Sequence, residues 1–348
     1  MTGPSPEQLF EAATQGDRTA KARLLSLIER GGEGARDVGR LAAPLAGHAY
    51  TIGLTGAPGA GKSTLTSALI TDLRRRDEEV AVLAVDPSSP FTGGAILGDR
   101  VRMQDHATDA GVFIRSMATR GHLGGLALAT PEAIRLLDAL GHRWIIVETV
   151  GVGQVEVEVA GKADTTVVVV NPGWGDSVQA SKAGLMEVAD VFAINKADRP
   201  GVDETRRDLQ QMLELATDTS PPSADGWTVP IVPTEATSGV GVPELWEAIV
   251  AHRGHATVSG ALEERRRFRL GEELREIVAR RLETRARELC TGDGWESLTD
   301  AVLAGDIDPW SAADEMLHPI LSFNFGPIGP DRKDGSGSSS PAGTSARR

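Results

Sequence analysis

A glycine-rich run with one lysine and one serine is the strongest chemical signal in the sequence. It follows the G-x-x-x-x-G-K-[ST] pattern of a phosphate-binding loop, with the residues Gly56, Ala57, Pro58, Gly59, Ala60, Gly61, Lys62 and Ser63. An apolar stretch at 51–55 precedes the run, and an amphipathic stretch at 63–76 follows it. In such loops backbone N–H groups surround a phosphate at a helix N-terminus, the lysine contacts the β- and γ-phosphates, and the serine binds magnesium. The sequence therefore predicts a nucleoside triphosphate site.

A second motif, Asn195-Lys196-Ala197-Asp198, follows a later apolar run and indicates which base is bound. Asp198 can accept hydrogen bonds from the guanine N1–H and exocyclic amine, the Lys196 stem can cover the base face, and Asn195 can brace the loop. Adenine offers no such pair of donors, so the motif predicts guanine. A segment after the next apolar run is expected to close over the base with backbone N–H groups, and its residues are Thr234, Glu235 and Ala236.

Two acidic residues, Asp86 and Glu148, end apolar runs that we predict to be strands. Nucleotide sites assemble at the carboxyl ends of parallel strands, so both carboxylates can contribute to magnesium binding. Glu148 stands where switch GTPases have the aspartate of Asp-x-x-Gly, and its longer side chain implies contact with magnesium through a water molecule.

The residue after Gly151 is Val152, where many GTPases have the glutamine that orients the attacking water. Intrinsic hydrolysis is therefore expected to be slow. Three alternatives remain for positioning the water: Gln154, Asp99, or a loop rearrangement induced by a partner. Normal turnover without a partner, after both side chains are removed, would contradict this hypothesis.

Lysine is rare in this chain, with six lysines against 30 arginines. Two of the six, Lys62 and Lys196, lie in the motifs described above. A compact ammonium is not interchangeable with a planar guanidinium where a phosphate or a base face is approached closely, so these lysines are predicted to be chemically required. Lys182 is a third candidate of this kind.

The elements that must position these residues alternate along the chain. Short β-branched runs lie at 50–56, 79–86, 143–151, 165–173, 190–198 and 229–236, separated by amphipathic stretches. This alternation predicts βαβ units, and with the phosphate loop it predicts an α/β P-loop NTPase fold with a mainly parallel central sheet flanked by helices.

Helical extensions are predicted at both ends of this core. Apolar residues recur at helical intervals over 6–46, with a break at Gly31-Gly32, and again in the charge-dense run 262–290. We predict a helical N-terminal extension at 1–47, a nucleotide domain at 48–255, a helical C-terminal region at 256–323 and a disordered tail at 324–348. The run Arg265–Arg267 is expected to be a solvated helix face.

The composition excludes several classes of protein. With 49 acidic and 36 basic residues, the formal charge of −13 argues against nucleic acid or an anionic membrane as a partner. Cys290 is the single cysteine, so a disulfide framework is excluded and the cytoplasm is the expected compartment. The first 30 residues lack the apolar core of a signal peptide, and the most apolar stretch, 165–170, is shorter than the roughly 20 residues of a spanning helix.

Seven segments together resemble the MeaB/ArgK family, the methylmalonyl-CoA mutase-associated GTPases. They are GAPGAGKST at 56–64, AVDPSSPFTGGAILGDRVRM at 84–103, FIRSMATRGHLGGL at 113–126, VETVGVGQVEVEVA at 147–160, NPGWGDSVQASKAG at 171–184, NKAD at 195–198 and DPWSAADEML at 308–317. The resemblance covers roughly residues 45–320 and adds Thr64 to the nucleotide loop. It implies a P-loop GTPase that binds GTP or GDP with Mg²⁺, usually as a homodimer through C-terminal helices, here 256–323.

The resemblance also implies roles for individual residues. The family's magnesium and switch carboxylates fall on Asp86, Asp99 and Glu148. Its third switch loop falls on 173–184, with Asp176 and Lys182 as the nucleotide-responsive pair. This sequence departs from the family at Val155, where the family often has serine after the Gly-Val-Gly-Gln segment.

The resemblance implies a GTP-hydrolysing chaperone that gates cofactor loading and protects an adenosylcobalamin-dependent acyl-CoA mutase, slow alone and activated by its partner. One alternative is a kinase or ATPase of the amino-acid-transport type, although the sequence holds no HRD-like acceptor base. The other is a metal-insertion GTPase. Such proteins store metal on clusters of cysteine and histidine, and one cysteine with scattered histidines does not form such a cluster.

Overall fold

The computed structural model describes residues 3–86, 104–106, 108–118, 125–149, 162–173, 186–219 and 226–321. The chain divides into two compact units, Met1–Ile277 and Val278–Arg348, which we describe separately. The tail predicted at 324–348 lies outside the described residues.

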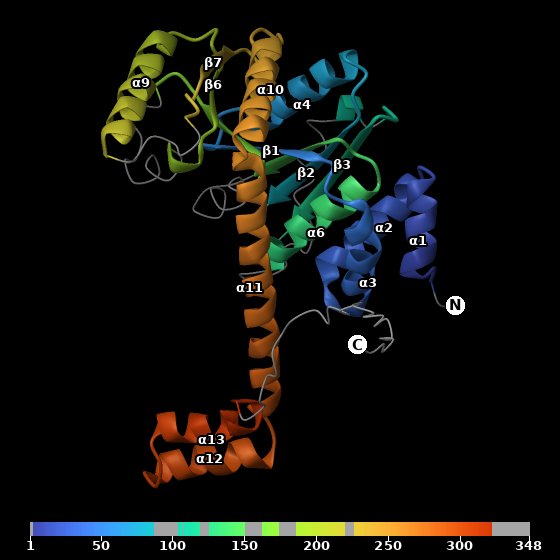
Figure 1. Ribbon diagram of the computed structural model, residues 1–348, viewed down its shortest axis with the longest axis vertical. Helices are drawn as coiled ribbons and strands as arrows, with labels where there is room; N and C mark the ends of the chain where they lie inside the picture. Colours follow the sequence, from blue (N-terminus) through green and yellow to red (C-terminus); the bar gives the residue numbers. More distant parts are fainter. Residues whose placement is uncertain are drawn as a thin grey trace, which may run out of the picture. The chain divides into compact units, whose positions relative to one another are not determined.

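The first unit is built on a seven-stranded sheet with the strand order β3-β2-β4-β1-β5-β6-β7 (Figure 1). The strands are β1 (Tyr50–Gly56), β2 (Val80–Asp86), β3 (Val112–Ala118), β4 (Trp144–Thr149), β5 (Thr165–Val170), β6 (Val191–Asn195) and β7 (Ile231–Thr234). All six pairings between neighbouring strands are parallel. The predicted parallel α/β sheet is therefore confirmed. Its strands all end on one side, which we call the carboxyl end of the sheet.

Strand β3 is the element that the sequence pattern did not predict. Arg115 and Ser116 interrupt its apolar run, so the run lacks the pattern of a buried strand. The strand lies at the end of the sheet order, next to β2. The Arg115 Nη2 atom lies 2.7 Å from a carboxylate oxygen of Glu29, so an N-terminal helix neutralises this polar residue.

The helices of the first unit are α1 (Pro6–Thr14), α2 (Arg18–Arg30), α3 (Gly32–Ala42), α4 (Lys62–Arg75), α6 (Gly125–Ala139), α9 (Val202–Thr219) and α10 (Val242–Ser259), with short 3-10 turns η1 (Ala43–Leu45) and η2 (Gln104–His106). Side chains alternate between the two faces of the sheet. Val167 and Val169 of β5 pack with α4 and α10, whereas Val168 and Val170 pack with α9. Helices therefore cover both faces, as βαβ connections require.

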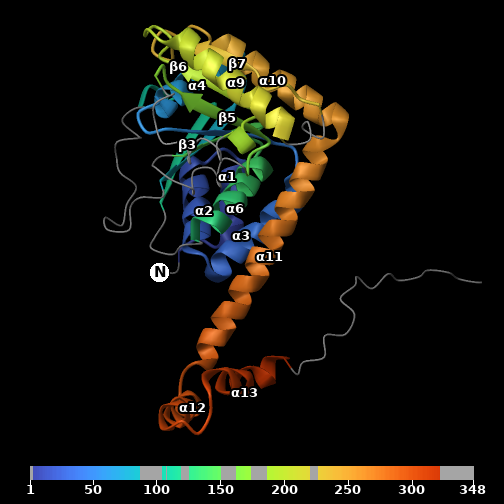
Figure 2. The ribbon, with the colours of Figure 1, turned by 90° about the vertical axis from the view of Figure 1, so that its left-hand side faces the viewer.

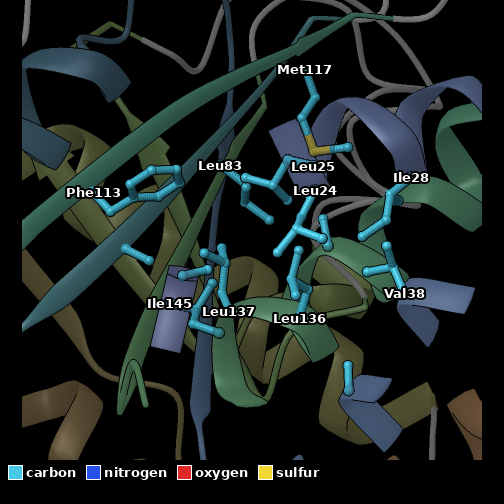
Figure 3. Close-up of a cluster of buried hydrophobic side chains, with 14 of the residues drawn as sticks. Leu24, Leu25, Ile28, Val38, Leu83, Phe113, Met117, Leu136, Leu137 and Ile145 are labelled. Atoms are coloured by element: carbon cyan, nitrogen blue, oxygen red, sulfur yellow. The ribbon is translucent and has the colours of Figure 1, made fainter. Parts of the chain in front are cut away.

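The predicted N-terminal helices form and pack on the sheet. Ser5 begins α1 with a capping box, and Asp17 accepts two backbone N–H groups at the start of α2. Figure 3 shows Leu24 and Leu25 of α2 beside Leu83 of the sheet, in a buried cluster that also includes α3 and α6. Figure 2 shows α1, α2 and α3 together with α6 in the same part of this unit. The N-terminal extension therefore contributes to the hydrophobic core of the first unit.

Helix α11 (Ala261–Leu289) corrects one expectation. Arg265 Nη1 donates to Asp190 at 2.8 Å, and Arg266 Nη2 donates to Asp164 at 2.6 Å. The prediction of a solvated face is wrong for these two arginines, because they neutralise carboxylates buried just before β6 and β5, at the amino end of the sheet. Arg267 is exposed as expected.

Burial raises the pKa of Asp164, but hydrogen bonding by Arg266 and the charges of Arg269 and Arg266 outweigh that effect and leave the pKa below its ordinary value. Arg269 also pairs with this carboxylate. Asp164 is 1% exposed and also accepts the backbone N–H of Thr51 at 3.0 Å. The amino end of the sheet thus holds α11 through charged hydrogen bonds.

The second unit contains the end of α11 followed by α12 (Asp293–Ala304) and α13 (Pro309–Leu321). Asp308 begins α13 by accepting the backbone N–H groups of Trp310 and Ser311. Across the described parts of the chain, no helix combines the length and the apolar character needed to cross a bilayer.

Candidate nucleotide-binding site

The glycines of the predicted phosphate loop occupy positions that reject a side chain. Strand β1 ends at Gly56, whose φ is 140° and where a Cβ atom would lie 2.0 Å from the carbonyl oxygen of Val169. Gly61 has a φ of 92°, and a Cβ there would lie 2.4 Å from the side-chain nitrogen of Asn195. The glycine pattern therefore results from close approaches of β5 and of the loop after β6, and from left-handed backbone at Gly61.

Two side chains of the loop after β6 donate hydrogen bonds to backbone carbonyls of the phosphate loop. Asn195 Nδ2 donates to the Ala60 carbonyl at 2.8 Å, and Lys196 Nζ donates to the Gly59 carbonyl at 2.5 Å. In a trans peptide the N–H points opposite to the C=O. The bond from Asn195 therefore directs the N–H of Gly61 away from that side chain.

Positive potential is concentrated inside this loop. Helix α4 begins at Lys62 with Gly61 as its N-cap and has no side-chain cap, so its N-terminal end faces the loop. Lys62 Nζ donates to the carbonyls of Gly56 at 2.6 Å and Ala57 at 3.3 Å, which places the ammonium within the loop. Thr64 follows in the first turn of α4 and is half-buried. This arrangement suits a phosphate anion.

The predicted magnesium ligands Ser63 and Glu148 are in contact. Ser63 Oγ donates a hydrogen bond to Glu148 Oε1, and both residues are buried. Parallel pairing places Glu148 beside Leu54 of β1, close to where the phosphate loop begins. A hydroxyl and a carboxylate form an all-oxygen donor set, which fits Mg²⁺, an ion that retains several waters and takes few protein ligands.

The base-reading motif joins three loops at the carboxyl end of the sheet. Asn195 Oδ1 accepts the backbone N–H of Ala236 at 3.2 Å and the hydroxyl of Thr234 at 3.3 Å. Its amide thus bridges the phosphate loop and the loop after β7. Lys196 has a φ of 60°, a left-handed conformation uncommon outside glycine, and Asp198 is exposed at the surface.

The backbone N–H groups of the segment after β7 already have acceptors. The N–H of Glu235 donates to the carbonyl of Val240 at 2.8 Å, while that of Ala236 donates to Asn195. In this structure both groups support the loop that surrounds Asn195.

The remaining predicted residues are placed only in part. The backbone of Asp86 ends β2, and the preceding residue, Val85, pairs with Thr149 of β4, so Asp86 lies at the same end of the sheet as the phosphate loop. The side chain of Asp86 lies outside the described part of the structure, as do Asp99, Gln154, Asp176 and Lys182.

Sequence reasoning missed Asn171, which directly follows β5. Its Nδ2 atom donates to the Gly59 carbonyl at 3.4 Å, the same oxygen that Lys196 contacts. The signal that could have identified it is its position, since β5 lies between β1 and β6 and a polar residue after it falls between the phosphate loop and the base loop.

Comparisons with known proteins agree with this geometry. The family profile described as "Methylmalonyl Co-A mutase-associated GTPase MeaB" matches residues 21–290. A protein of Pyrococcus abyssi whose name describes a GTPase is 51% identical over 315 residues, covering 90% of this chain and 97% of that protein. The mouse protein named "Methylmalonic aciduria type A homolog, mitochondrial" is 33% identical over 277 residues, covering 78% of this chain and 66% of the mouse protein.

A solved structure described as a LAO/AO transport system kinase superposes with a TM-score of 0.66. It is 27% identical to this chain and the match covers 92% of this chain and 99% of that one. The same fold therefore extends over nearly the whole of both chains.

Proposed function

This chain belongs to the methylmalonyl-CoA mutase-associated GTPase family, and from that premise we propose that it is a GTP-hydrolysing chaperone of an adenosylcobalamin-dependent acyl-CoA mutase. Guanine nucleotide binding and GTP hydrolysis come with the family. The proposed client is supported by the family description, which names methylmalonyl-CoA mutase, and by the name of the mouse relative. In this role the protein gates cofactor loading and protects the mutase.

The observation that carries the nucleotide part of the proposal is the double use of Asn195. Its amide donates to the Ala60 carbonyl of the phosphate loop and accepts from Ala236 beside the base-reading loop. The Asn195 side chain therefore fixes the distance between the phosphate loop and the base-reading loop. We assign the phosphates to 56–64 and the guanine edge to Asp198.

The residues at the phosphate loop have distinct roles in hydrolysis. Lys62 neutralises charge on the β- and γ-phosphates, and the N-terminal amides of α4 donate to them. Ser63 and Glu148 would hold Mg²⁺, with Asp86 and Asp99 completing the predicted set. When bound, the ion neutralises charge that develops on the phosphate oxygens. These groups position and stabilise, and of them only Asp99 is also a candidate for orienting the attacking water.

Slow intrinsic turnover is part of the proposal. Val152 stands where many GTPases have the glutamine that orients the attacking water, so Gln154, Asp99 or a partner-induced rearrangement supplies that function. Lys182 and Asp176 are proposed to respond to the nucleotide in the third switch loop. A client that orders these segments would raise the rate constant for hydrolysis.

We also propose that the protein is a cytoplasmic homodimer that associates through the helices of 256–323. Helix α11 supports this, because it exposes apolar side chains both in the stretch of the first unit, Leu270 and Leu274, and in the stretch of the second unit, Val278 and Leu282. Exposed apolar residues gathered on a helix are typical of a protein interface. Light scattering on the full chain should therefore give the mass of a dimer.

The decisive experiment measures GTP and ATP hydrolysis by the purified protein, alone and with a B12-dependent acyl-CoA mutase of the same organism. We expect a slow, GTP-selective rate that rises when the mutase is added. A rate indifferent to the mutase would contradict the chaperone function, and a preference for ATP would contradict the base assignment.

The solved relative at 27% identity carries the name of a transport kinase, which makes a kinase the competing function. The two functions differ in their product. A GTPase releases one inorganic phosphate for each GTP consumed, whereas a kinase produces a stable phosphorylated acceptor. Radiolabelled γ-phosphate followed through the reaction distinguishes them.

A further inference from the structure

The residues that follow β5 connect helix α9 to the phosphate loop. Asn171 Nδ2 donates to the Gly59 carbonyl at 3.4 Å. Two residues later the backbone N–H of Gly173 donates to the hydroxyl oxygen of Thr205 at 3.1 Å. Thr205 belongs to the first turn of α9 and is 2% exposed. A short, directly bonded path therefore runs from α9 through 171–173 to the phosphate loop.

The receiving end of this path is the peptide between Gly59 and Ala60, whose N–H donates to the Ala57 carbonyl at 3.1 Å. Gly59 has a φ of 73°, and a Cβ atom placed there would meet nothing within 4 Å, so the space beside this residue is open. Its carbonyl accepts from Lys196 Nζ at 2.5 Å and from Asn171. Two hydrogen bonds from outside the loop thus hold the carbonyl of the Gly59 peptide, while its N–H is held within the loop. The ammonium supplies the stronger bond because it is charged.

The side chain of Asn171 lowers the stability of the folded state at this position. Its Oδ1 atom is buried and has no hydrogen-bond donor among the residues that the structure describes. A buried acceptor without a donor destabilises the folded state, and an apolar side chain of similar size would avoid that cost. Among the described residues, the hydrogen bond that this amide makes is the one from its Nδ2 atom to the Gly59 carbonyl.

The other end of the path is fixed by backbone geometry. Gly173 has a φ of 82°, a left-handed conformation that directs its N–H toward Thr205. Gly201, with a φ of 97°, lies where a Cβ atom would come within 3.7 Å of Pro172. The backbone N–H of Thr205 donates to the Gly201 carbonyl at 3.0 Å. The segment 171–173 is thus seated on the start of α9.

We propose that Asn171 and Thr205 are positioning residues that tie the Gly59 peptide to α9 and so set the affinity of the phosphate loop for nucleotide. Helix α9 follows the base-reading loop, so the tie is a further connection between the base and phosphate subsites, beside Asn195 and Lys196. This inference rests on the proposed assignment of 56–64 as the nucleotide loop. Asn171 and Thr205 are not among the residues predicted to orient the attacking water, so loss of the tie is expected to weaken GTP and GDP binding equally and to leave kcat unchanged.

The test compares Thr205→Val, which removes the hydroxyl at similar volume, with Thr205→Ser, which keeps it. Asn171→Ala and Asn171→Leu remove the donor at the other end. The matched control is Thr257→Val, because Thr257 is an exposed helical threonine of α10 whose hydroxyl donates to the Arg253 carbonyl at 2.7 Å. Each full-length variant is assayed for GDP and GTP dissociation constants, for kcat and KM, and for the ³¹P resonance of the β-phosphate in bound GDP.

We expect Thr205→Val and both Asn171 variants to raise KM and both dissociation constants about three- to tenfold, the range for loss of one neutral hydrogen bond. The value of kcat should stay within about twofold, and the β-phosphate resonance should move. Thr205→Ser and Thr257→Val should match the wild type. Unchanged dissociation constants with an unmoved resonance would overturn the inference, as would an equal rise of the dissociation constants in the Thr257→Val control.

Lys62→Ala separates this inference from the proposed function. If Lys62→Ala binds nucleotide as the wild type does, the assignment of the nucleotide loop fails. If Lys62→Ala loses binding while the Asn171 and Thr205 variants retain wild-type constants, only the tie to α9 fails. Thermal melting of every variant identifies any that fails to fold.

Discussion

The two ends of the central sheet both bury carboxylates, and they satisfy them with different partners. At the amino end, Asp164 and Asp190 accept hydrogen bonds from the guanidinium groups of α11. At the carboxyl end, Glu148 accepts from the hydroxyl of Ser63. Guanidinium groups neutralise a carboxylate and commit it to the fold, so the amino end is built for attachment. At the carboxyl end the Ser63 hydroxyl and the Glu148 carboxylate form an all-oxygen donor set that suits Mg²⁺.

The backbone conformation and its hydrogen bonds also differ between the two ends of the sheet. At the carboxyl end Gly56, Gly61 and Lys196 have positive φ values, and peptide carbonyls accept from side chains of neighbouring loops. At the amino end side chains of Asp164 and Asp190 accept backbone N–H groups just inside regular strands. Unusual backbone conformations persist where the surrounding structure holds them, and they cluster at binding sites. Both ends bury carboxylates, so charge pairing alone does not show which end binds a ligand. The unusual backbone conformations indicate the carboxyl end.

The largest expected effect on stability comes from the amino end. Asp164→Asn leaves Arg266 and Arg269 without their carboxylate, and we expect the free energy of unfolding to fall by about 3–4 kcal/mol. The control is Asp37→Asn, which breaks an exposed pair with Arg40 and should cost less than about 1 kcal/mol. Urea titration of both variants gives the values. Equal stability of the two variants would show that the amino end does not depend on charge pairing.

The matching change at the carboxyl end should affect chemistry and leave stability nearly intact. Lys62→Ala removes the ammonium from the phosphate loop, and we expect kcat/KM for GTP to fall about 100- to 1000-fold. Lys162→Ala removes the same charge near the start of β5 and should retain hydrolysis. Steady-state phosphate release measures both. A comparable loss in the two variants would mean that general charge, and not the loop, governs the rate.

The same contrast explains what could be predicted from the sequence. The phosphate loop and the Asn195–Asp198 motif are predictable because each is a short contiguous run whose residue types and spacing identify it. The ion pairs of Arg265 and Arg266 are not, since their carboxylates lie 75 and 102 residues away and no local pattern connects them.

Strand β3 was missed for a related reason. Its Arg115 resembles a loop residue until α2 supplies Glu29 as its partner, 86 residues away in the chain. Asn171 was likewise not singled out, because its role depends on β5 lying between β1 and β6. Long-range pairing, and not local propensity, thus decides the residues that sequence reasoning missed.

Acid should weaken the amino end first, through His142. This histidine precedes β4, is 5% exposed, and its Nε2 lies 2.7 Å from the Nζ atom of Lys21. Burial, together with the charges of Lys21 and Arg18, lowers the pKa of His142 from 6.5 to about 4. The unfolded chain therefore binds a proton at this residue at a higher pH than the folded chain does, and stability falls as pH falls from 6.5 toward 4.

The size of this effect is measurable by comparison with a variant that cannot titrate. Between pH 7.5 and pH 5 we expect His142 to reduce the free energy of unfolding by about 2 kcal/mol. His142→Gln should lack that component, while the carboxylates contribute to both proteins alike. Urea titrations at both pH values give the difference between the two proteins. A difference that does not change with pH would contradict the buried, neutral state of His142.

The smallest expected effect tests whether the exposed carboxylate at the carboxyl end serves a ligand. Asp198 is exposed, so an exchange to asparagine should leave stability unchanged. Asp198→Asn loses the charged acceptor for the guanine N1–H and amine, and we expect GTP affinity to fall about tenfold, the effect of one hydrogen bond to a charged group. The new amide can donate to the additional carbonyl of xanthine, so the preference should move toward xanthosine triphosphate. Competition between the two nucleotides measures this preference. An undiminished preference for GTP would contradict the assignment of Asp198 to the base site. The functional contrast between the two ends of the sheet would then fail as well.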